Sequence, residues 1–170
     1  PDAVRVEVDD LDALAGPEAL DFEALDGALT ALALAAPDQA RVVELRYFAG
    51  LSIEDSTGDP GEPLHDLELA VERVRAAREA IDDSGTGVLL TARSEGFVVG
   101  RPDLEETIRR LCAYAAAGAD CLYAPRIDTV EQVAAIVDAV SPKPVNLLIN
   151  APFMTVAQAA DLGVRRISVG

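Results

Sequence analysis

After about residue 50, short apolar runs alternate along the chain with longer amphipathic stretches. The apolar runs predict strands, and the amphipathic stretches predict helices. Because no hairpin signal joins consecutive runs, the alternation favours parallel strands connected by crossover helices. The strands are expected near residues 51–54, 88–92, 120–124, 145–149 and 166–169. The helices are expected between them, at residues 66–82, 103–117, 130–140 and 156–162.

Local signals mark the ends of some of these helices. Asp103 is expected to cap the N-terminus of its helix, because a short acidic side chain can accept a hydrogen bond there. Gly118 and Gly163 lie where two of the helices should end before the next strand. Five strands and four helices fit either a doubly wound sheet or part of a (β/α)8 barrel, and the pattern leaves both open.

The first fifty residues have a different, helical pattern. Leu25, Leu29 and Leu32 recur at spacings of four and three residues, and Leu34 follows them. Pro37 fits the first turn of a second helix that would run to Gly50. We therefore expect two helices within residues 18–49. The expected domains are a helical segment at 1–50 and an α/β part at 51–170.

Composition limits the classes of function. The formal net charge is −16, and so acidic a surface repels phosphate backbones, so no nucleic-acid partner is expected. No run of eighteen apolar residues occurs, so no membrane span is expected. Two cysteines, Cys112 and Cys121, make neither a disulfide framework nor a metal motif. A cytoplasmic location is the resulting expectation.

Candidate reactive groups lie where the predicted strands end, because parallel α/β folds gather their reactive side chains at that edge. The strand ends carry Glu54-Asp55, Arg93-Ser94-Glu95, Pro125-Arg126 and Asn150, while Asn146 and Ser168 lie inside the last two strands. Among them Glu54 and Arg93 make an acid and an arginine that end neighbouring strands. A carboxylate can hold Mg²⁺ directly or through water, and a guanidinium can bind a substrate carboxylate with two hydrogen bonds. The alternative interpretation is that Glu54 and Arg93 form only a structural ion pair across the strand ends.

Five blocks of sequence carry a resemblance to a known family. They are IEDSTGDP, TARSEGFVVGRPDLEETIRR, YAAAGADCLYAP, PVNLL and LGVRRISVG. In this order they resemble successive segments of the isocitrate lyase and phosphoenolpyruvate mutase superfamily, from about residue 51 to residue 170. The resemblance implies that the five strands are strands four to eight of a (β/α)8 TIM barrel. The expected fold is therefore α/β, a partial barrel preceded by a short helical segment.

The resemblance also implies roles for individual residues. Glu54 takes the place of the family's acidic residue after strand four, which helps to hold Mg²⁺, usually through water. Arg93 takes the place of the strand-five arginine, which binds a substrate carboxylate and stabilises an enolate-like intermediate. Asn146 and Ser168 would line the substrate pocket. The implied activity is that of a Mg²⁺-dependent lyase or mutase acting on small 2-oxo acids.

Two departures from the family pattern change this expectation. Isocitrate lyases carry a K-K-C-G-H loop after strand four, whose cysteine is the acid, whereas this chain has STGDPGEPLHD. The family's main metal-binding aspartates, in strands two and three, have no counterpart before residue 50. We therefore expect that the chain is not a true isocitrate lyase and that it is inactive alone. Its open strand edge should also promote self-association into a homo-oligomer.

Residues 24–54 resemble a second family. Their sequence, and ARVVELRYFAGLSIE in particular, is similar to the promoter-reading C-terminal region of an extracytoplasmic-function sigma factor. In that family a further helix reads the major groove, but here the pattern ends at Asp55 and that helix is missing. The alternatives to an enzyme are thus a sigma-type transcription module or a non-catalytic fragment. The two adjoining resemblances suggest a chimeric or fused chain.

Overall fold

The computed structural model describes residues 34, 50–149 and 153–169. Apart from Leu34, these residues belong to one compact unit, Val42–Gly170. The two helices predicted within residues 18–49 lie outside the described residues, again apart from Leu34.

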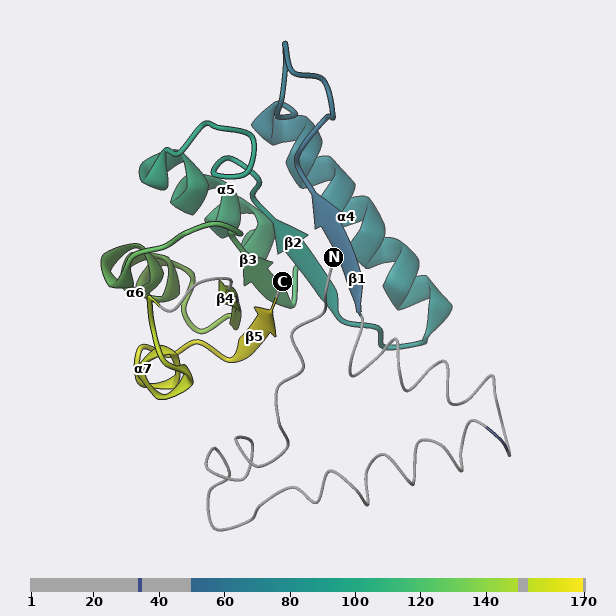
Figure 1. Cartoon of the computed structure of the whole chain (residues 1–170). Helices are drawn as coiled ribbons and strands as arrows, with labels where there is room; N and C mark the ends of the chain where they lie inside the picture. The colour runs from purple at the N-terminus through teal and green to yellow at the C-terminus, as the bar shows by residue number, and fades with distance from the viewer. Residues whose placement is uncertain (1–33, 35–49, 150–152, 170) are drawn as a thin grey trace. The chain divides into compact units, whose positions relative to one another are not determined.

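The described α/β part alternates strands with helices (Figure 1). The strands are β1 (Leu51–Glu54), β2 (Leu90–Arg93), β3 (Cys121–Tyr123), β4 (Val145–Ile149) and β5 (Arg166–Val169). The helices are α4 (Leu67–Ser84), α5 (Leu104–Ala116), α6 (Val130–Val140) and α7 (Val156–Asp161). Every element lies within a few residues of its predicted position, so the predicted order is confirmed. None of these helices combines the length and the apolar character that a membrane crossing requires.

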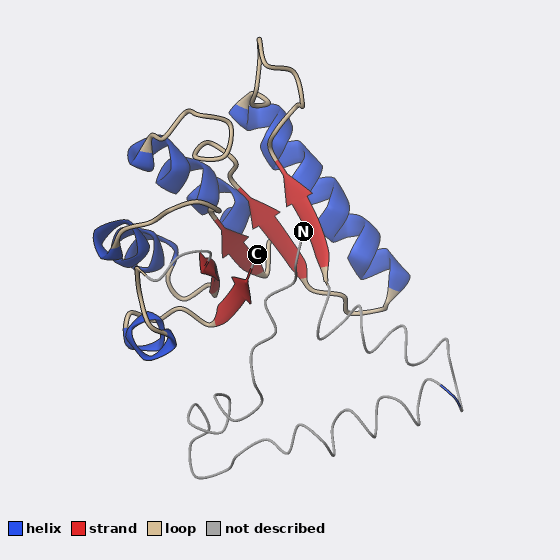
Figure 2. Ribbon diagram, viewed as in Figure 1, coloured by secondary structure: helices blue, strands red, loops and turns tan. Residues whose placement is uncertain are grey.

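The strands form one parallel sheet in the order β1-β2-β3-β4-β5. A doubly wound sheet reverses its strand order at one point, and its helices then cover both faces. A sequential order with right-handed crossovers instead keeps the helices on one face. Figure 2 shows the helices outside the strands, as this rule requires. The strand order therefore decides between the two predicted architectures in favour of part of a (β/α)8 barrel.

Alternation along the strands separates an apolar outer face from a polar inner face. On the outer face Ala92, Leu122 and Leu147 are each 0% exposed and pack in the core against the helices. Because neighbouring strand residues point to opposite faces, Arg93 and Asn146 face the other way. Burial of a large aliphatic side chain stabilises a fold by about 1.5–3 kcal/mol, so this core holds the strands in place. The polar side chains are left on the concave inner face.

Local signals define several helix ends as predicted. Oδ1 of Asp103 accepts a hydrogen bond from the backbone N–H of Glu106 at 3.0 Å and so caps α5. Capping boxes begin α6 and α7. Gly118 follows α5 with a φ of 106°, and Gly163 follows α7 with a φ of 96°. Residues that carry a side chain rarely adopt a positive φ of this size, which explains why glycine occupies both positions.

Candidate active site

Glu54 and Arg93 meet where β1 and β2 end. They are register partners in the sheet, and Nη1 of Arg93 lies 3.5 Å from Oε2 of Glu54. The predicted convergence of these two residues at one edge is confirmed. Their side chains are 50% and 29% exposed, so solvent screens the pair and it contributes little to stability. This distance is also what the alternative interpretation, a structural ion pair, predicts.

Asn146 and Ser168 contact each other on neighbouring strands. Nδ2 of Asn146 donates a hydrogen bond to Oγ of Ser168 at 3.0 Å. Asn146 is only 3% exposed, yet its Oδ1 has no hydrogen-bond partner among the described residues. A buried carbonyl oxygen without a partner is unfavourable, so this atom is suited to accept a hydrogen bond from a ligand or a water molecule.

A hollow of about 300 Å³ opens on the polar inner face of the sheet. It brings together three of the four residues proposed from sequence, Arg93, Asn146 and Ser168. Glu54 does not line the hollow itself but contacts Arg93, which does. The other described residues of the wall are Ser52, Thr91, Tyr123, Leu148, Arg166 and Val169. Hydroxyl, amide and guanidinium groups therefore converge there from all five strands.

Glu95 is a close partner of Arg93 that the sequence did not single out. Nε of Arg93 donates a hydrogen bond to Oε1 of Glu95 at 2.7 Å, and the guanidinium carbon lies 5.1 Å from the centre of the Tyr123 ring. These contacts fix the guanidinium from two sides. Burial raises the pKa of Glu95 above its ordinary value, while Arg93 acts in the opposite direction. A signal existed, since Glu95 stands two residues after Arg93 at a strand end.

Arg166 is a second guanidinium of the hollow that sequence reasoning missed. Its Nη1 donates a hydrogen bond to Oγ1 of Thr91 at 3.0 Å. Unlike Arg93, it makes no ion pair with a carboxylate in the described part of the chain. Arg166 stands two residues before Ser168, so strand alternation could have placed both on the inner face.

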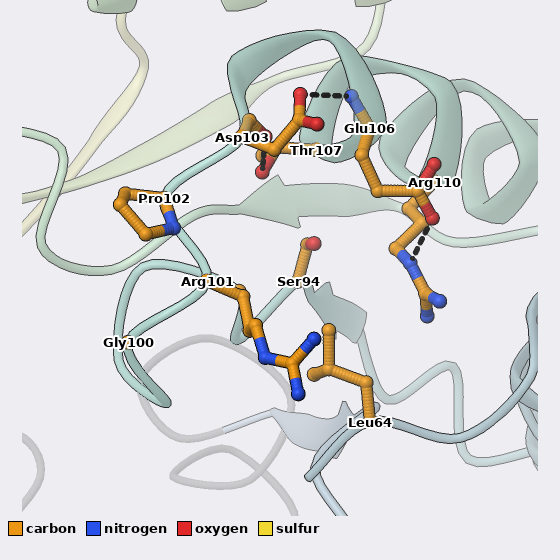
Figure 3. A pocket seen from close by; sticks show the side chains of 10 residues that line it. Leu64, Ser94, Gly100, Arg101, Pro102, Asp103, Glu106, Thr107 and Arg110 are labelled. Carbon is orange, nitrogen blue, oxygen red and sulfur yellow. Dashed lines mark hydrogen bonds and ion pairs between the residues drawn. The ribbon is translucent and has the colours of Figure 1, made fainter. Parts of the chain in front are cut away.

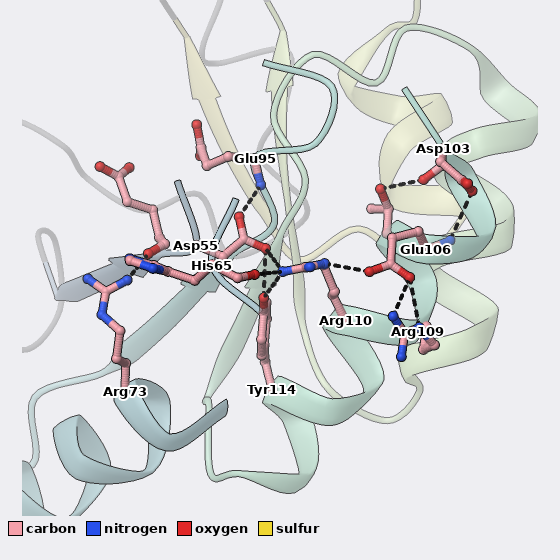
Figure 4. Close-up of polar contacts among 11 residues, drawn as sticks. Asp55, His65, Arg73, Glu95, Asp103, Glu106, Arg109, Arg110 and Tyr114 are labelled. Carbon is pink, nitrogen blue, oxygen red and sulfur yellow. Dashed lines mark hydrogen bonds and ion pairs between the residues drawn. The ribbon is translucent and has the colours of Figure 1, made fainter. Parts of the chain in front are cut away.

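Beside this edge, the buried Asp55 is bound by side chains of α5 (Figure 4). Its Oδ2 accepts a hydrogen bond from the hydroxyl of Tyr114 at 2.7 Å and lies 3.1 Å from Nη1 of Arg110. Its Oδ1 accepts a hydrogen bond from the backbone N–H of Glu95 at 2.8 Å. Asp55 therefore joins the end of β1, helix α5 and the backbone that carries Glu95.

The charges in this cluster are matched. Burial raises the pKa of Tyr114, and the neighbouring Asp55 raises it further, so the hydroxyl stays protonated and donates. Burial alone lowers the pKa of Arg110, but hydrogen bonds to Glu106 and Tyr114 outweigh it and raise the pKa above the usual range. A buried charge with its partners in place is stable, whereas loss of one partner is costly. The cluster is thus a rigid support for the Arg93–Glu95 contact.

Mg²⁺ is the cofactor that the sequence resemblance implies. Across residues 50–149 and 153–169, no three His, Cys, Asp or Glu side chains lie together in a way that could hold a metal ion. The donors that are present nevertheless have suitable chemistry, because Glu54 offers a half-exposed carboxylate and Asn146 an unpartnered carbonyl oxygen. Mg²⁺ prefers oxygen ligands in octahedral geometry and usually keeps several waters. Glu54 fits a water-mediated ligand better than a site of its own.

Comparison with known proteins places the chain in a family. The model of the phosphoenolpyruvate phosphomutase family matches residues 35–170. The chain therefore belongs to the phosphoenolpyruvate phosphomutase family, and the superfamily predicted from the five sequence blocks is confirmed. The matched range overlaps residues 24–54, whose resemblance to a sigma factor stays a prediction.

Several relatives share the described fold. An uncharacterized protein of Mycobacterium tuberculosis is 32% identical over 123 residues, which are 72% of this chain and 44% of that protein. A provisionally assigned lyase/mutase from Burkholderia cenocepacia J2315 is 43% identical with a TM-score of 0.67, over 70% of this chain and 43% of that one. For 2,3-dimethylmalate lyase, a member of the phosphoenolpyruvate mutase/isocitrate lyase superfamily, the identity is 28% and the TM-score 0.64, over 71% of this chain and 43% of that one. For oxaloacetate acetylhydrolase in complex with the product oxalate, the identity is 28% and the TM-score 0.63, over 71% of this chain and 43% of that one. The chain spans less than half the length of these relatives.

Proposed function

We propose that this chain forms the strand-four-to-eight part of a Mg²⁺-dependent lyase or mutase that acts on small 2-oxo acids through an enolate-like intermediate. The hollow of about 300 Å³ that unites Arg93, Asn146 and Ser168 carries the proposal. Two similar structures, 2,3-dimethylmalate lyase and oxaloacetate acetylhydrolase, are named for small dicarboxylic acids, and one contains oxalate. Oxaloacetate is a 2-oxo acid and supports the proposed substrate class, whereas 2,3-dimethylmalate is a hydroxy acid and supports only a small dicarboxylate.

Arg93 is proposed to bind the substrate carboxylate. Its Nε is occupied by Glu95, while neither Nη1 nor Nη2 makes a hydrogen bond in the described part of the chain. The ion pair with Glu54, at 3.5 Å, is too long for a strong hydrogen bond. Arg93 thus has two parallel N–H donors available, which match the two oxygens of a carboxylate. Glu95 acts as a positioning residue, because it fixes the plane of the guanidinium.

Asn146 and Ser168 are proposed to orient the substrate. Because Ser168 already accepts a hydrogen bond from Asn146, its own hydroxyl proton is free to point into the hollow. Oδ1 of Asn146 can accept a hydrogen bond from a hydroxyl group of the substrate or from a water molecule bound to it. The pair therefore presents one donor and one acceptor side by side, on the wall that also holds Arg93.

Glu54 is proposed to hold Mg²⁺ through water at the rim. The ion, when bound, supplies positive charge beside the oxo group, where negative charge develops in an enolate-like intermediate. One carboxylate cannot complete an octahedral oxygen shell. We therefore propose that the 170-residue chain is inactive alone and that further metal ligands come from another polypeptide segment. A cytoplasmic location stays a prediction.

Self-association is proposed from the open edges of the sheet. In the described sheet β1 and β5 each have a neighbour on one side only. An unpaired strand edge is a template for further pairing, and Leu51 and Val169 on these strands are 39% and 74% exposed. A homo-oligomer would cover these groups. Sedimentation velocity at several concentrations tests the proposal, and a monomer at every concentration would contradict it.

The activity proposal is tested by turnover. A full-length family member, supplied with Mg²⁺ and oxo or hydroxy acids of about four to seven carbons, should release pyruvate or glyoxylate. The 170-residue chain under the same conditions should release neither. EDTA-sensitive turnover by the chain alone would contradict the proposed need for further metal ligands. Absence of such turnover in the full-length protein, for every acid tried, would contradict the proposed function.

A further inference from the structure

A second cavity lies outside the polar inner face, between the loop after β2 and the start of α5 (Figure 3). Its volume is about 480 Å³. The loop contributes Gly96, Gly100 and Arg101, and Leu64 closes the wall from the segment between β1 and α4. Among the residues that the structure describes, none lines both this cavity and the hollow that contains Arg93. The two are separate spaces on opposite sides of the end of β2.

Ser94 provides a polar group in the cavity wall that has no partner within the described part of the chain. It follows Arg93 directly, so its side chain points to the opposite face from the Arg93 guanidinium. Its backbone N–H donates to the carbonyl oxygen of Tyr123 at 2.9 Å, which fixes its position. The residue is 0% exposed, yet its Oγ has no hydrogen-bond partner among the described residues. A buried hydroxyl without a partner is unfavourable, so a ligand that pairs with it gains binding energy.

Arg101 provides a positive charge without a partner in the described part of the chain. The other arginines nearby are paired, Arg110 with Asp55 and Glu106, and Arg109 with Glu106. Burial acts to raise the pKa of Glu106, but its hydrogen bonds to Arg109 and Arg110 lower it. The Glu106 carboxylate is therefore ionised and already paired with these two arginines. Arg101 is exposed and makes no such pair with any residue that the structure describes, and Figure 3 shows its guanidinium pointing into the cavity toward Leu64 and Ser94.

The start of α5 and the apolar wall narrow the class of ligand. The N-terminus of this 13-residue helix, reached through Pro102 and Asp103, favours a negative charge. The carboxylates of Asp103 and Glu106 also line the cavity and disfavour a doubly charged anion. Leu64 and Pro102 offer carbon surface to an apolar body. A single negative charge on a short apolar chain meets all of these conditions.

We propose that this cavity is a second ligand site and that it binds a small monocarboxylate. The carboxylate pairs with Arg101 and accepts a hydrogen bond from Ser94, and the apolar chain lies against Leu64 and Pro102. The site is independent of the proposed activity, because Arg93 takes no part in it.

Butyrate is the probe for this site, and inorganic phosphate is the comparison ligand. Titration of butyrate into the 170-residue chain should give saturable shifts of the Gly96 and Gly100 amide resonances at millimolar concentration. Arg101→Gln should weaken binding at least tenfold, since it removes a charged hydrogen bond. The control Arg75→Gln removes an equal charge from an exposed position of α4 and should leave the affinity unchanged. Absence of saturable shifts, equal binding of phosphate, or equal binding by Arg101→Gln would overturn the proposal.

Ser94→Ala gives an independent test that does not depend on Arg101. The variant removes an unpaired buried hydroxyl, so the ligand-free protein should unfold at the same temperature as wild type or at a higher one. Butyrate should raise that temperature less in the variant than in wild type, because one hydrogen bond to the ligand is lost. An equal rise in both proteins would overturn the part assigned to Ser94.

Discussion

Arg93 and Glu95 form a hydrogen-bonded ion pair within one strand end, with 2.7 Å between Nε and Oε1. The Glu95 side chain is 5% exposed, whereas that of Arg93 is 29% exposed. The carboxylate is thus the fixed partner and the guanidinium the accessible one. This arrangement is suited to binding an external anion, because the Arg93 guanidinium is already oriented before the ligand binds.

The protonation of Glu95 should affect stability in a defined pH range. Burial raises its pKa above the ordinary value of 4.5, although Arg93 acts to lower it. A carboxyl with a higher pKa in the folded state binds more protons when folded than when unfolded. Its contribution to stability is therefore present below pH 4.5 and is lost as pH rises through the folded pKa. Glu95→Gln, which cannot ionise, should become more stable relative to wild type as pH rises.

Urea unfolding of Glu95→Gln and wild type at a series of pH values checks this prediction. The matched control is Glu79→Gln, at an exposed position of α4. A stability difference between Glu95→Gln and wild type that is constant with pH would contradict the raised pKa of Glu95.

The buried cluster at Asp55 should dominate the stability of this sheet edge. Asp55→Asn leaves the guanidinium of Arg110 without its buried counter-charge and should cost about 3–5 kcal/mol. Tyr114→Phe removes one hydrogen bond to the same carboxylate and should cost about 1–2 kcal/mol. The control is Asp82→Asn, which breaks the ion pair between Asp82 and Arg78. Because the Asp82 side chain is 65% exposed, this substitution should cost less than about 1 kcal/mol of stability. Denaturant unfolding measures all three, and equal losses for Asp55→Asn and Asp82→Asn would contradict the account.

Much of the fold and part of the site could be predicted from sequence because the signals are local. Apolar runs and amphipathic stretches gave the order of the elements, and parallel strand ends share an edge, so Glu54 and Arg93 were expected together. The choice between a barrel and a doubly wound sheet needed the strand order, which no single segment encodes.

Other features depend on contacts between distant segments. Asp55 meets Arg110 and Tyr114 across 55 and 59 residues of chain, through the packing of α5 on the sheet. No local pattern announces such a partner. The isolated hydroxyl of Ser94 is likewise visible only once the surrounding loop is in place.

The resemblance of residues 24–54 to a sigma factor leads to a negative prediction. Within residues 18–49 the basic side chains are Arg41 and Arg46, and phosphate contacts need clustered Lys and Arg. The chain should therefore not bind promoter DNA. Fluorescence anisotropy with promoter and scrambled duplexes, repeated over a salt series, tests this. Sub-micromolar binding that prefers the promoter sequence would refute it.

Arg93 should be essential to turnover in a full-length family member. Arg93→Ala, introduced at the corresponding strand end, leaves a substrate carboxylate without its two-donor partner. Loss of such a contact in a closed site costs about 2–5 kcal/mol, or a loss of roughly thirtyfold to several-thousandfold in kcat/KM. Steady-state kinetics on the variant and wild type give the ratio. A loss of less than about threefold would show that Arg93 has only a structural role.

Binding of oxalate tests most directly whether the hollow at Arg93 recognises a carboxylate. Oxalate is the product found in the similar oxaloacetate acetylhydrolase structure. Isothermal titration of oxalate, without added metal, into the 170-residue chain should show saturable binding, weakened at least tenfold by Arg93→Gln and unchanged by the exposed control Arg75→Gln. Binding that is absent, or that is equally strong in Arg93→Gln, would contradict the account.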